Sequence, residues 1–291
     1  MRTVSPRTAV RRLEPGSGPV EVAYREPHPR LRELGVRWFG YREHEASQAT
    51  RRHVPGARVG LVFGFGDGLR VTEPSANGGT TSVHHSFIAG PHATALESTS
   101  LGRLSIMQLE LSPACAHAVF GVPLHELSNG VVDLRDLIGR SADEICERLA
   151  EAPDWDARFT LLEQVLTAPL DQARDRDHTV LSVWDALRHS HGQARISELA
   201  DRAGWTRRHL DRRFLDRIGL PPKTMARVLR IQRALDLIRT DSDLSWATVA
   251  AECGYYDQAH FNREFRGIVG CTPTTLRAEW AARPAGAVQL G

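Results

Sequence analysis

The pattern of hydrophobic and polar residues changes after about residue 112. Between Val20 and Leu111 the two kinds alternate in short runs rich in β-branched and aromatic residues, as in 58–66 and 104–111. Such alternation is typical of β-strands. Asp67-Gly68 and the sequence Asn-Gly-Gly at 77–79 favour the positive-φ turns that join antiparallel strands. Several short strands at this spacing predict a small antiparallel β-barrel or β-sandwich.

From Pro113 onward the apolar residues recur at helical spacing, first over 114–120 and 134–138. Ser141 and Glu144 have the spacing of a capping box, which predicts a helix starting there. The next apolar stripe, predicted to end at Pro169, allows two interpretations: it packs against its own barrel, or it pairs with a second copy in a dimer. Its members are Phe159, Leu162, Val165 and Leu166.

The stretch 195–273 contains nearly the same pattern twice. Residues 196–204 align with 246–254, and a glycine followed by an aromatic residue ends each copy. Thr206 and Asp257 then provide side-chain oxygens that cap a second helix. A short helix, a glycine turn and a capped helix predict a helix-turn-helix unit, here in two copies. The amphipathic helix expected over 224–240 would hold the copies at a fixed separation.

The second helix of each copy is the candidate for reading DNA. In a helix-turn-helix, the early exposed residues of this helix reach base edges in the major groove. Arginine fits the acceptors of guanine, and glutamine and asparagine fit adenine. The residues predicted to contact DNA are Arg207, Arg208, Asp211 and Arg212 in the first copy and Gln258, His260, Asn262 and Arg263 in the second. They should divide into base readers and phosphate contacts, which sequence does not separate.

Charge and cysteine content agree with a DNA-binding module joined to a different domain. From His178 onward the chain has 17 basic and 12 acidic residues, against 20 and 23 in the rest. The four cysteines are scattered, which indicates reduced thiols in a cytoplasmic protein. His84 and His85 are adjacent, so on a strand they point to opposite faces and do not form a metal pair. We therefore expect no metal, no other cofactor and no enzymatic activity.

The C-terminal part resembles the DNA-binding domain of the AraC/XylS family of bacterial transcription regulators. The resemblance rests on 196–204, on Arg212-x-Phe214 with Gly219, and above all on 253–265 with Gly270-Cys-Thr-Pro273. It implies a seven-helix domain that contacts bases. The positions matching the family's base contacts are Arg208, Arg212, Gln258, Asn262 and Arg263. Asp211 departs from the pattern, because an acidic group beside phosphates repels them, although it could accept from cytosine.

The resemblance also implies an N-terminal cupin-like barrel that binds a small-molecule effector, followed by helices that dimerise. The expected fold is therefore α+β, with a β-barrel and its helices followed by an all-α domain with two helix-turn-helix units. The expected partners are double-stranded DNA, an effector, RNA polymerase and a second copy, with no membrane. The expected division is a flexible leader (1–19), a sensor and dimerisation domain (20–172), a linker (173–179), a DNA-binding domain (180–281) and a tail (282–291).

Two other functions stay open at this point. In one, the protein binds DNA without an effector, as a repressor or architectural protein whose barrel only dimerises. In the other, an enzyme is tethered to DNA, which would need a metal or a carboxylate pair in the barrel. An alkyl-transfer repair activity is disfavoured, because it needs zinc-bound cysteines near the N-terminus and the first cysteine is Cys115.

Overall fold

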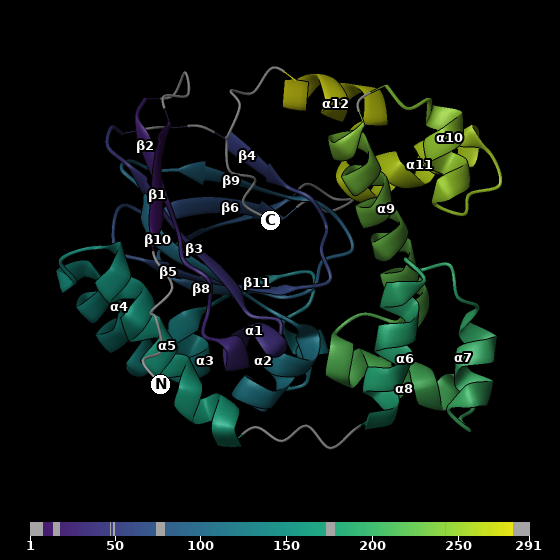
Figure 1. The fold of residues 1–291 in the computed structure, drawn as a ribbon, viewed down its shortest axis with the longest axis horizontal. Coiled ribbons are helices and arrows are strands. Elements are labelled where there is room, and N and C mark those ends of the chain that lie inside the picture. The colour runs from purple at the N-terminus through teal and green to yellow at the C-terminus, as the bar shows by residue number, and fades with distance from the viewer. Residues whose placement is uncertain are drawn as a thin grey trace.

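The computed structural model of the protein describes residues 8–13, 18–46, 48, 50–73, 79–172, 178–241 and 243–281. Within them the strands lie before residue 134, and the chain from 178 onward is helical. Figure 1 shows the strands and the first helices on one side of the molecule and the later helices on the other. The predicted α+β class, an antiparallel β part followed by an all-α part, is confirmed.

The larger β layer is a seven-stranded antiparallel sheet with β10 (Ser105–Leu111) at its centre. Alternate residues of β10 face two sides: Met107, Leu109 and Leu111 pack in one core, while Ile106 packs in another core on the face that also carries Gln108 and Glu110. The other strands, from one edge to the other, are β1 (Ala9–Leu13), β2 (Val20–Tyr24), β3 (Arg37–Glu43), then β5 (Val59–Gly64), β8 (Phe87–Ala89) and β11 (Val131–Asp133).

A second antiparallel sheet has the order β4 (Thr50–His53), β9 (Leu96–Ser100), β6 (Leu69–Glu73) and β7 (Thr80–His84). One apolar cluster joins the two sheets, with Phe39 and Ile106 from the larger sheet and Leu69 and Val71 from the smaller. The strands therefore form two packed sheets, and the barrel is not closed within the described part of the chain.

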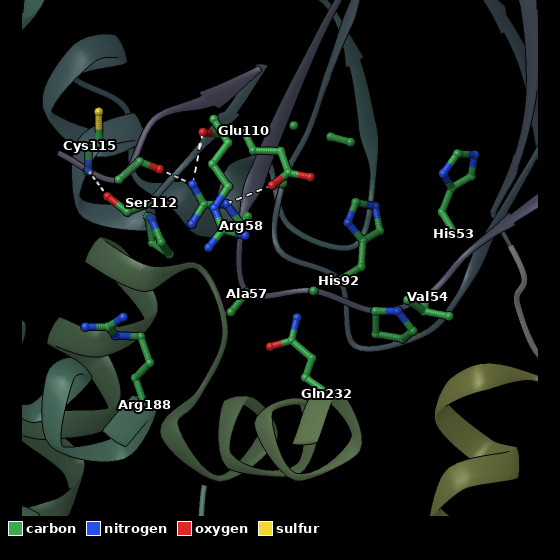
Figure 2. A pocket seen from close by; sticks show the side chains of 18 of the residues that line it. His53, Val54, Ala57, Arg58, His92, Glu110, Ser112, Cys115, Arg188 and Gln232 are labelled. Atoms are coloured by element: carbon green, nitrogen blue, oxygen red, sulfur yellow. Dashed lines mark hydrogen bonds and ion pairs between the residues drawn. The ribbon is translucent and has the colours of Figure 1, made fainter. Parts of the chain in front are cut away.

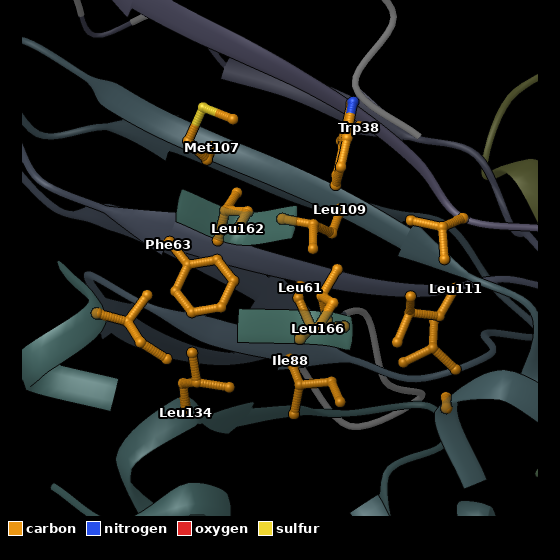
Figure 3. Close-up of a cluster of buried hydrophobic side chains, with 14 of the residues drawn as sticks. Trp38, Leu61, Phe63, Ile88, Met107, Leu109, Leu111, Leu134, Leu162 and Leu166 are labelled. Carbon is orange, nitrogen blue, oxygen red and sulfur yellow. The ribbon is translucent and has the colours of Figure 1, made fainter. Parts of the chain in front are cut away.

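The other face of the larger sheet is covered by helices. Met107, Leu109 and Leu111 of β10 point to this side and pack with Phe63 and other buried apolar residues (Figure 3). The helices that share this core are α2 (Pro113–Phe120), η1 (Leu124–Glu126), α3 (Leu134–Ile138), α4 (Ser141–Glu151) and α5 (Trp155–Gln172). The short α1 (Pro29–Glu33) contributes Leu31 to the same core.

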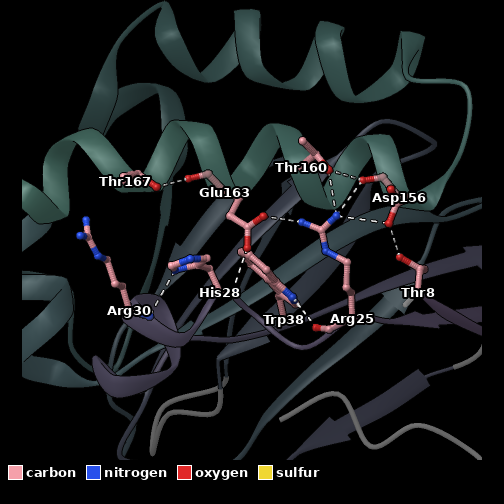
Figure 4. A network of polar contacts seen from close by, with 9 residues as sticks. All are labelled: Thr8, Arg25, His28, Arg30, Trp38, Asp156, Thr160, Glu163 and Thr167. Carbon is pink, nitrogen blue, oxygen red and sulfur yellow. Dashed lines mark hydrogen bonds and ion pairs between the residues drawn. The ribbon is translucent and has the colours of Figure 1, made fainter. Parts of the chain in front are cut away.

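The apolar stripe of α5 packs against its own domain. Phe159, Leu162 and Leu166 are buried in the core beneath the larger sheet. Figure 4 shows the polar side of the same contact, where Arg25 bonds Glu163 at 2.7 Å and the Thr160 hydroxyl at 2.8 Å. The first interpretation of this stripe is thus confirmed, and its residues are not available to pair with a second copy.

Three expectations about local structure were wrong. Ser141 is the first helical residue of α4 and caps nothing, because Arg140 before it already has helical φ and ψ angles. Helix α5 continues past Pro169 to Gln172. Within the expected leader, Ala9–Leu13 forms β1 and pairs with β2. Four ranges lie outside the described residues: 1–7 and 14–17 of the expected leader, 173–177 of the expected linker, and the expected tail 282–291.

In the described residues from 178 onward, six helices are arranged around a seventh, α9 (Pro222–Thr240). Helix α9 begins two residues before its predicted start. The first half of α9 packs in one apolar core, through Met225 and Val228, and its second half in another, through Ala234 and Leu235. In Figure 1 the remaining helices gather at the two ends of α9. They are α6 (His178–His189), α7 (Ile196–Arg202), α8 (Arg207–Ile218), α10 (Trp246–Glu252), α11 (Gln258–Val269) and α12 (Pro273–Ala281).

Candidate functional site

The two predicted helix-turn-helix units are α7 with α8, called unit 1, and α10 with α11, called unit 2. Helices α8 and α11 both have 12 residues. The Thr206 hydroxyl accepts from the His209 amide, and the Asp257 carboxylate accepts from the His260 amide. Each helix ends at a glycine with positive φ, +93° at Gly219 and +84° at Gly270. These caps define equal start and end points for the two helices.

In unit 1 the predicted contact residues lie on the outside of α8. Arg207, Arg208 and Arg212 are exposed and Asp211 is half-buried. The inward face carries Leu210 and Phe214, both fully buried in the core around the first half of α9. One guanidinium nitrogen of Arg212 lies 3.3 Å from Nδ1 of His209. The three guanidinium groups are thus presented to solvent along the first turns of the helix.

In unit 2 the arrangement is the same with different chemistry. Gln258, His260 and Arg263 are exposed and Asn262 is half-buried, while Phe261 and Phe265 are buried beneath them. The His260 ring lies edge-on to Tyr255, with centroids 5.3 Å apart. Each predicted contact residue thus lies within the first two turns of its helix. The sequence brings the two sets to matching places on two helices.

Sequence reasoning missed Tyr256. When the caps Thr206 and Asp257 are placed in register, the turn of unit 2 has one more residue than that of unit 1, and the extra residue is Tyr256. Its side chain is 95% exposed, beside the start of α11. The change in the repeat offset from 50 residues before the turn to 51 after it could have identified this residue.

A half-buried carboxylate joins α11 to α9. Glu264 accepts from the Tyr255 hydroxyl at 2.8 Å, from Arg230 at 3.2 Å and from Arg227 at 3.1 Å. Burial alone would raise the pKa of Glu264, but the Tyr255 hydrogen bond and the two arginines outweigh it and lower the pKa. The ionised carboxylate is therefore the favoured form, and it sets the position of α11 relative to α9.

A second candidate site is a cavity of about 1620 Å³ between the β part and α6 and α9 (Figure 2). Gln232 of α9 faces it across from Ala57 and His92, and Arg58 with its partner Glu110 lies at another wall. Apolar lining comes from both sheets and both helices. Among these residues are Val62, Leu69, Phe87, Ile106, Leu181, Trp184 and Leu229.

His92 is the most unusual polar group of the cavity. It is 7% exposed, and its Nε2 has no hydrogen-bond partner among the described residues. Burial lowers the pKa of His92 to about 4, despite the opposing hydrogen bond with the Gly90 backbone. A neutral imidazole with an unsatisfied nitrogen can bind one polar group of a small molecule. The predicted site residues did not include this cavity, because its walls come from distant parts of the sequence.

The two halves of the molecule touch each other directly on both sides of this cavity. Ala57 packs in the core of unit 1 and Val54 packs against that of unit 2. The Ala95 amide donates to the Ile268 carbonyl at 2.8 Å, and Arg52 lies 3.4 Å from Glu279. At the other end, a Cβ on Gly219 would come within 2.3 Å of the Ser128 hydroxyl. Two residues that line the cavity, Ala57 and Val54, thus contact unit 1 and unit 2 respectively.

Two other kinds of site are absent from the described part of the chain. In the described ranges no three His, Cys, Asp or Glu side chains are grouped so that they could hold a metal ion. No helix of the described chain is both long and apolar enough to cross a membrane.

Comparison with known families places the two halves separately. Residues 199–279 match the model of a helix-turn-helix domain, and this range contains α9, unit 2 and all of unit 1 except the first three residues of α7. Residues 24–133 match the model of a domain of unknown function, DUF6597, and this range contains most of the two sheets.

The chain is 31% identical over 132 residues to a probable bifunctional transcriptional activator/DNA repair enzyme AlkA of Mycobacterium tuberculosis, which is 45% of this chain and 23% of that protein. It is 32% identical over 111 residues to an uncharacterized HTH-type transcriptional regulator of Staphylococcus aureus, which is 38% of this chain and 14% of that protein. The chain thus matches less than a quarter of the length of these curated relatives.

Among solved structures, ToxT from Vibrio cholerae O395 aligns with 85% of this chain and 98% of its own, at 11% identity and a TM-score of 0.47. The DNA-binding domain of AdpA, solved in complex with a target DNA, aligns with 36% of this chain and 94% of its own, at 31% identity and a TM-score of 0.34. The C-terminal part of the chain therefore contains a helix-turn-helix domain of the AraC type.

Proposed function

We propose that the protein is a transcription regulator that reads one extended, non-palindromic DNA site with both units. The observation that carries this proposal is the pair of equally capped helices, α8 and α11, whose exposed early residues are polar and whose inner faces pack on the same helix α9. Two reading helices on one frame can enter successive major grooves, about 34 Å apart. Each unit then contributes one block of the recognised sequence.

The side chains suggest which bases each unit prefers. In unit 1, Arg208 and Arg212 have the forked donors that match guanine. In unit 2, Gln258 and Asn262 have the donor and acceptor pair that matches adenine, and Arg263 adds a guanine contact. We assign Arg207, Asp211 and His260 to positions beside the backbone, where they adjust affinity more than sequence preference.

Selection from a random duplex library tests this reading. We expect the wild type to enrich a site with two separate blocks. Arg212→Ala should weaken binding to that site by about 1–3 kcal/mol and relax the preference within one block only. Arg148→Ala, an exposed arginine of α4 in the other half of the molecule, is the control and should leave binding unchanged. If the wild type enriches no sequence, the proposal of specific DNA reading is wrong.

We further propose that the cavity beside α9 binds a small-molecule effector. The support is its size, its mixed apolar and polar lining, and its contact with helices α6 and α9 of the DNA-binding half. A ligand that binds one arrangement of the two halves more tightly shifts the population toward it, and DNA affinity changes by the same coupling energy. The acting protein would be cytoplasmic, without enzymatic activity, with RNA polymerase as its partner.

The alternative is a regulator that needs no effector, whose β part only holds the molecule together or dimerises it. The apolar cluster between the two sheets, which fills part of the β interior, favours this candidate. A thermal-shift screen of small metabolites separates the two. We expect a hit that raises Tm and changes DNA affinity, and that loses both effects in Gln232→Trp, where the larger side chain occupies the cavity. A screen in which no compound alters DNA affinity supports the alternative.

Sedimentation of the same protein would test for a homodimer, which cannot use the buried stripe of α5.

A further inference from the structure

A basic groove of about 610 Å³ lies between the two units, on the side of α9 opposite to the effector cavity. One wall is the turn between α6 and α7, from Gly192 to Ile196. The floor is the first half of α9, and the other wall is the start of α11. The basic residues that line it are Arg195, Lys223, Arg227, Arg230 and His260.

The groove keeps a positive charge after its internal pairing is considered. Glu264 is its one acidic lining residue, and it pairs with Arg227 and Arg230. Arg195 pairs with Glu198 at 3.5 Å, but both side chains are more than half exposed, so this pair is weak. Lys223 is exposed at the start of α9. Four permanently basic side chains thus face one carboxylate.

The walls of the groove are held together. The Gln193 side chain donates to the Glu252 carbonyl at 3.1 Å, which joins the α6–α7 turn to the end of α10. A Cβ on Gly192 would lie 2.1 Å from the Ala226 carbonyl oxygen, so this turn lies directly on α9. The basic side chains therefore project from a fixed frame, and the groove exists before any ligand binds.

We propose that this groove holds the phosphodiester backbone of the DNA segment that connects the two blocks read by α8 and α11. This inference rests on the proposed function. A duplex that enters both units must carry its backbone across the space between them, and this groove borders that space through the start of α7 and the start of α11. Phosphates bind to lysine and arginine without regard to sequence, so the groove contributes affinity and register. The single carboxylate of Glu264 pairs with two arginines, Arg227 and Arg230, so the groove surface stays positive.

Salt dependence of DNA binding is the test. Each phosphate contact released by a substitution should reduce the slope of log K against log salt by about 0.9. For Lys223→Ala with Arg195→Ala we therefore expect a slope smaller by about 1.8, on the selected site and on random duplex alike. Arg233→Ala removes a charge from the opposite face of α9, toward the effector cavity, and should leave the slope as in the wild type.

Ethylation interference supplies an independent readout. Ethylating the phosphates between the two blocks should block binding of the wild type and have little effect on the double variant. If the double variant keeps the wild-type slope and interference pattern while Arg212→Ala still relaxes specificity, the groove proposal is wrong and the proposed function stands. If no selected site exists for the wild type, the proposed function itself fails.

The same basic chemistry could bind a free phosphate group. Titration with inorganic phosphate, followed by the amide NMR signals of Lys223 and Arg195, distinguishes this source. Saturation by inorganic phosphate together with an unchanged DNA salt slope in the double variant would overturn the DNA assignment. Weak, unsaturated shifts together with the reduced slope support it.

Discussion

Unit 1 and unit 2 have the same local design and different surroundings. In both, an oxygen side chain caps a helix of 12 residues, a histidine of the first turn stacks edge-on against the aromatic residue of the turn, and a positive-φ glycine ends the helix. With the caps in register, Arg212 corresponds to Arg263 and Phe214 to Phe265. The repeated residues thus determine where each helix starts, ends and faces inward.

The residues that differ between the units determine what each one is attached to. At the position of Glu264, which joins α11 to α9, unit 1 has Arg213. Gly219 of unit 1 lies against Leu124 and Ser128 of the N-terminal half, whereas the equivalent Gly270 has open space around it. A duplicated fold can therefore be held in two different ways. Both units pack on α9 and both touch the N-terminal half, but the close contact at the terminal glycine belongs to unit 1 and the Glu264 link to α9 belongs to unit 2.

The largest expected effect concerns the shared cores. Phe214→Ala and Phe265→Ala each remove a fully buried ring, and each should lower the free energy of unfolding by about 3–5 kcal/mol. Chemical denaturation measures this loss. Equal losses would show that the two cores are equivalent. A loss confined to one variant would contradict the idea of two matched units.

Substitution of the glycines that end α8 and α11, Gly219 and Gly270, compares the surroundings of the two units. Gly270→Ala forces an alanine into positive φ, which should cost about 1 kcal/mol of unfolding free energy. Gly219→Ala has the same backbone cost, and its methyl group also meets the Ser128 hydroxyl and the Leu124 carbonyl. We therefore expect Gly219→Ala to cost about 2–3 kcal/mol.

The contact at Gly219 also predicts a change of arrangement. Limited proteolysis or small-angle scattering should detect loosening of the two halves in Gly219→Ala and none in Gly270→Ala. Identical behaviour of the two variants would mean that the N-terminal half does not hold unit 1.

Unit 2 has its own matched test at Glu264. Glu264→Gln keeps the size of the side chain but removes the charge that holds Arg227 and Arg230, and it should cost about 1.5–3 kcal/mol of unfolding free energy. Arg230 remains partly buried beside the neutral amide, which is the main reason for the loss. Arg213→Gln, the equivalent change in unit 1, is the comparison, and we expect a smaller cost there.

The pH dependence follows from the lowered pKa of Glu264. Because the folded-state pKa lies below the ordinary value of 4.5, the stabilisation is present above that pH and is lost as pH falls through the folded-state pKa. Denaturation at pH 7 and at pH 3 should show a difference between wild type and Glu264→Gln that shrinks in acid. A difference that stays constant would mean that the carboxylate charge contributes nothing.

The fold class and both units could be predicted from sequence because their signals are local. Strand alternation, the caps Thr206 and Asp257, and the repeated glycines act within a few residues of themselves. The errors occurred where tertiary context decides. Ser141 is preceded by a helical turn and so cannot cap, and Ala9–Leu13 becomes a strand because β2 offers it an edge.

The candidate sites show the same division. The outward position of the proposed reading residues, such as Arg212 and Asn262, could be predicted because the face that a residue occupies on a helix follows from periodicity. The cavity beside α9 could not be predicted, because His92, Gln232 and Arg58 come from separate elements that meet only in the folded protein. Tyr256 was missed although the one-residue change in repeat offset marked it.

The smallest expected effect exchanges one pair of equivalent residues. Asp211 of α8 corresponds to Asn262 of α11, and both are half-buried near the proposed DNA surface. Asp211→Asn removes a negative charge that would repel phosphates, so affinity for random duplex should rise by about 0.5–1 kcal/mol at low salt. Asn262→Asp should lower it by a similar amount, and both differences should shrink as added salt screens the charges. Fluorescence anisotropy at two salt concentrations measures both differences in affinity.

Opposite and equal shifts in affinity would place the two helices at equal distances from the DNA backbone. A shift from only one exchange would show that one unit alone approaches random DNA, and the symmetrical docking of the two units would then be wrong.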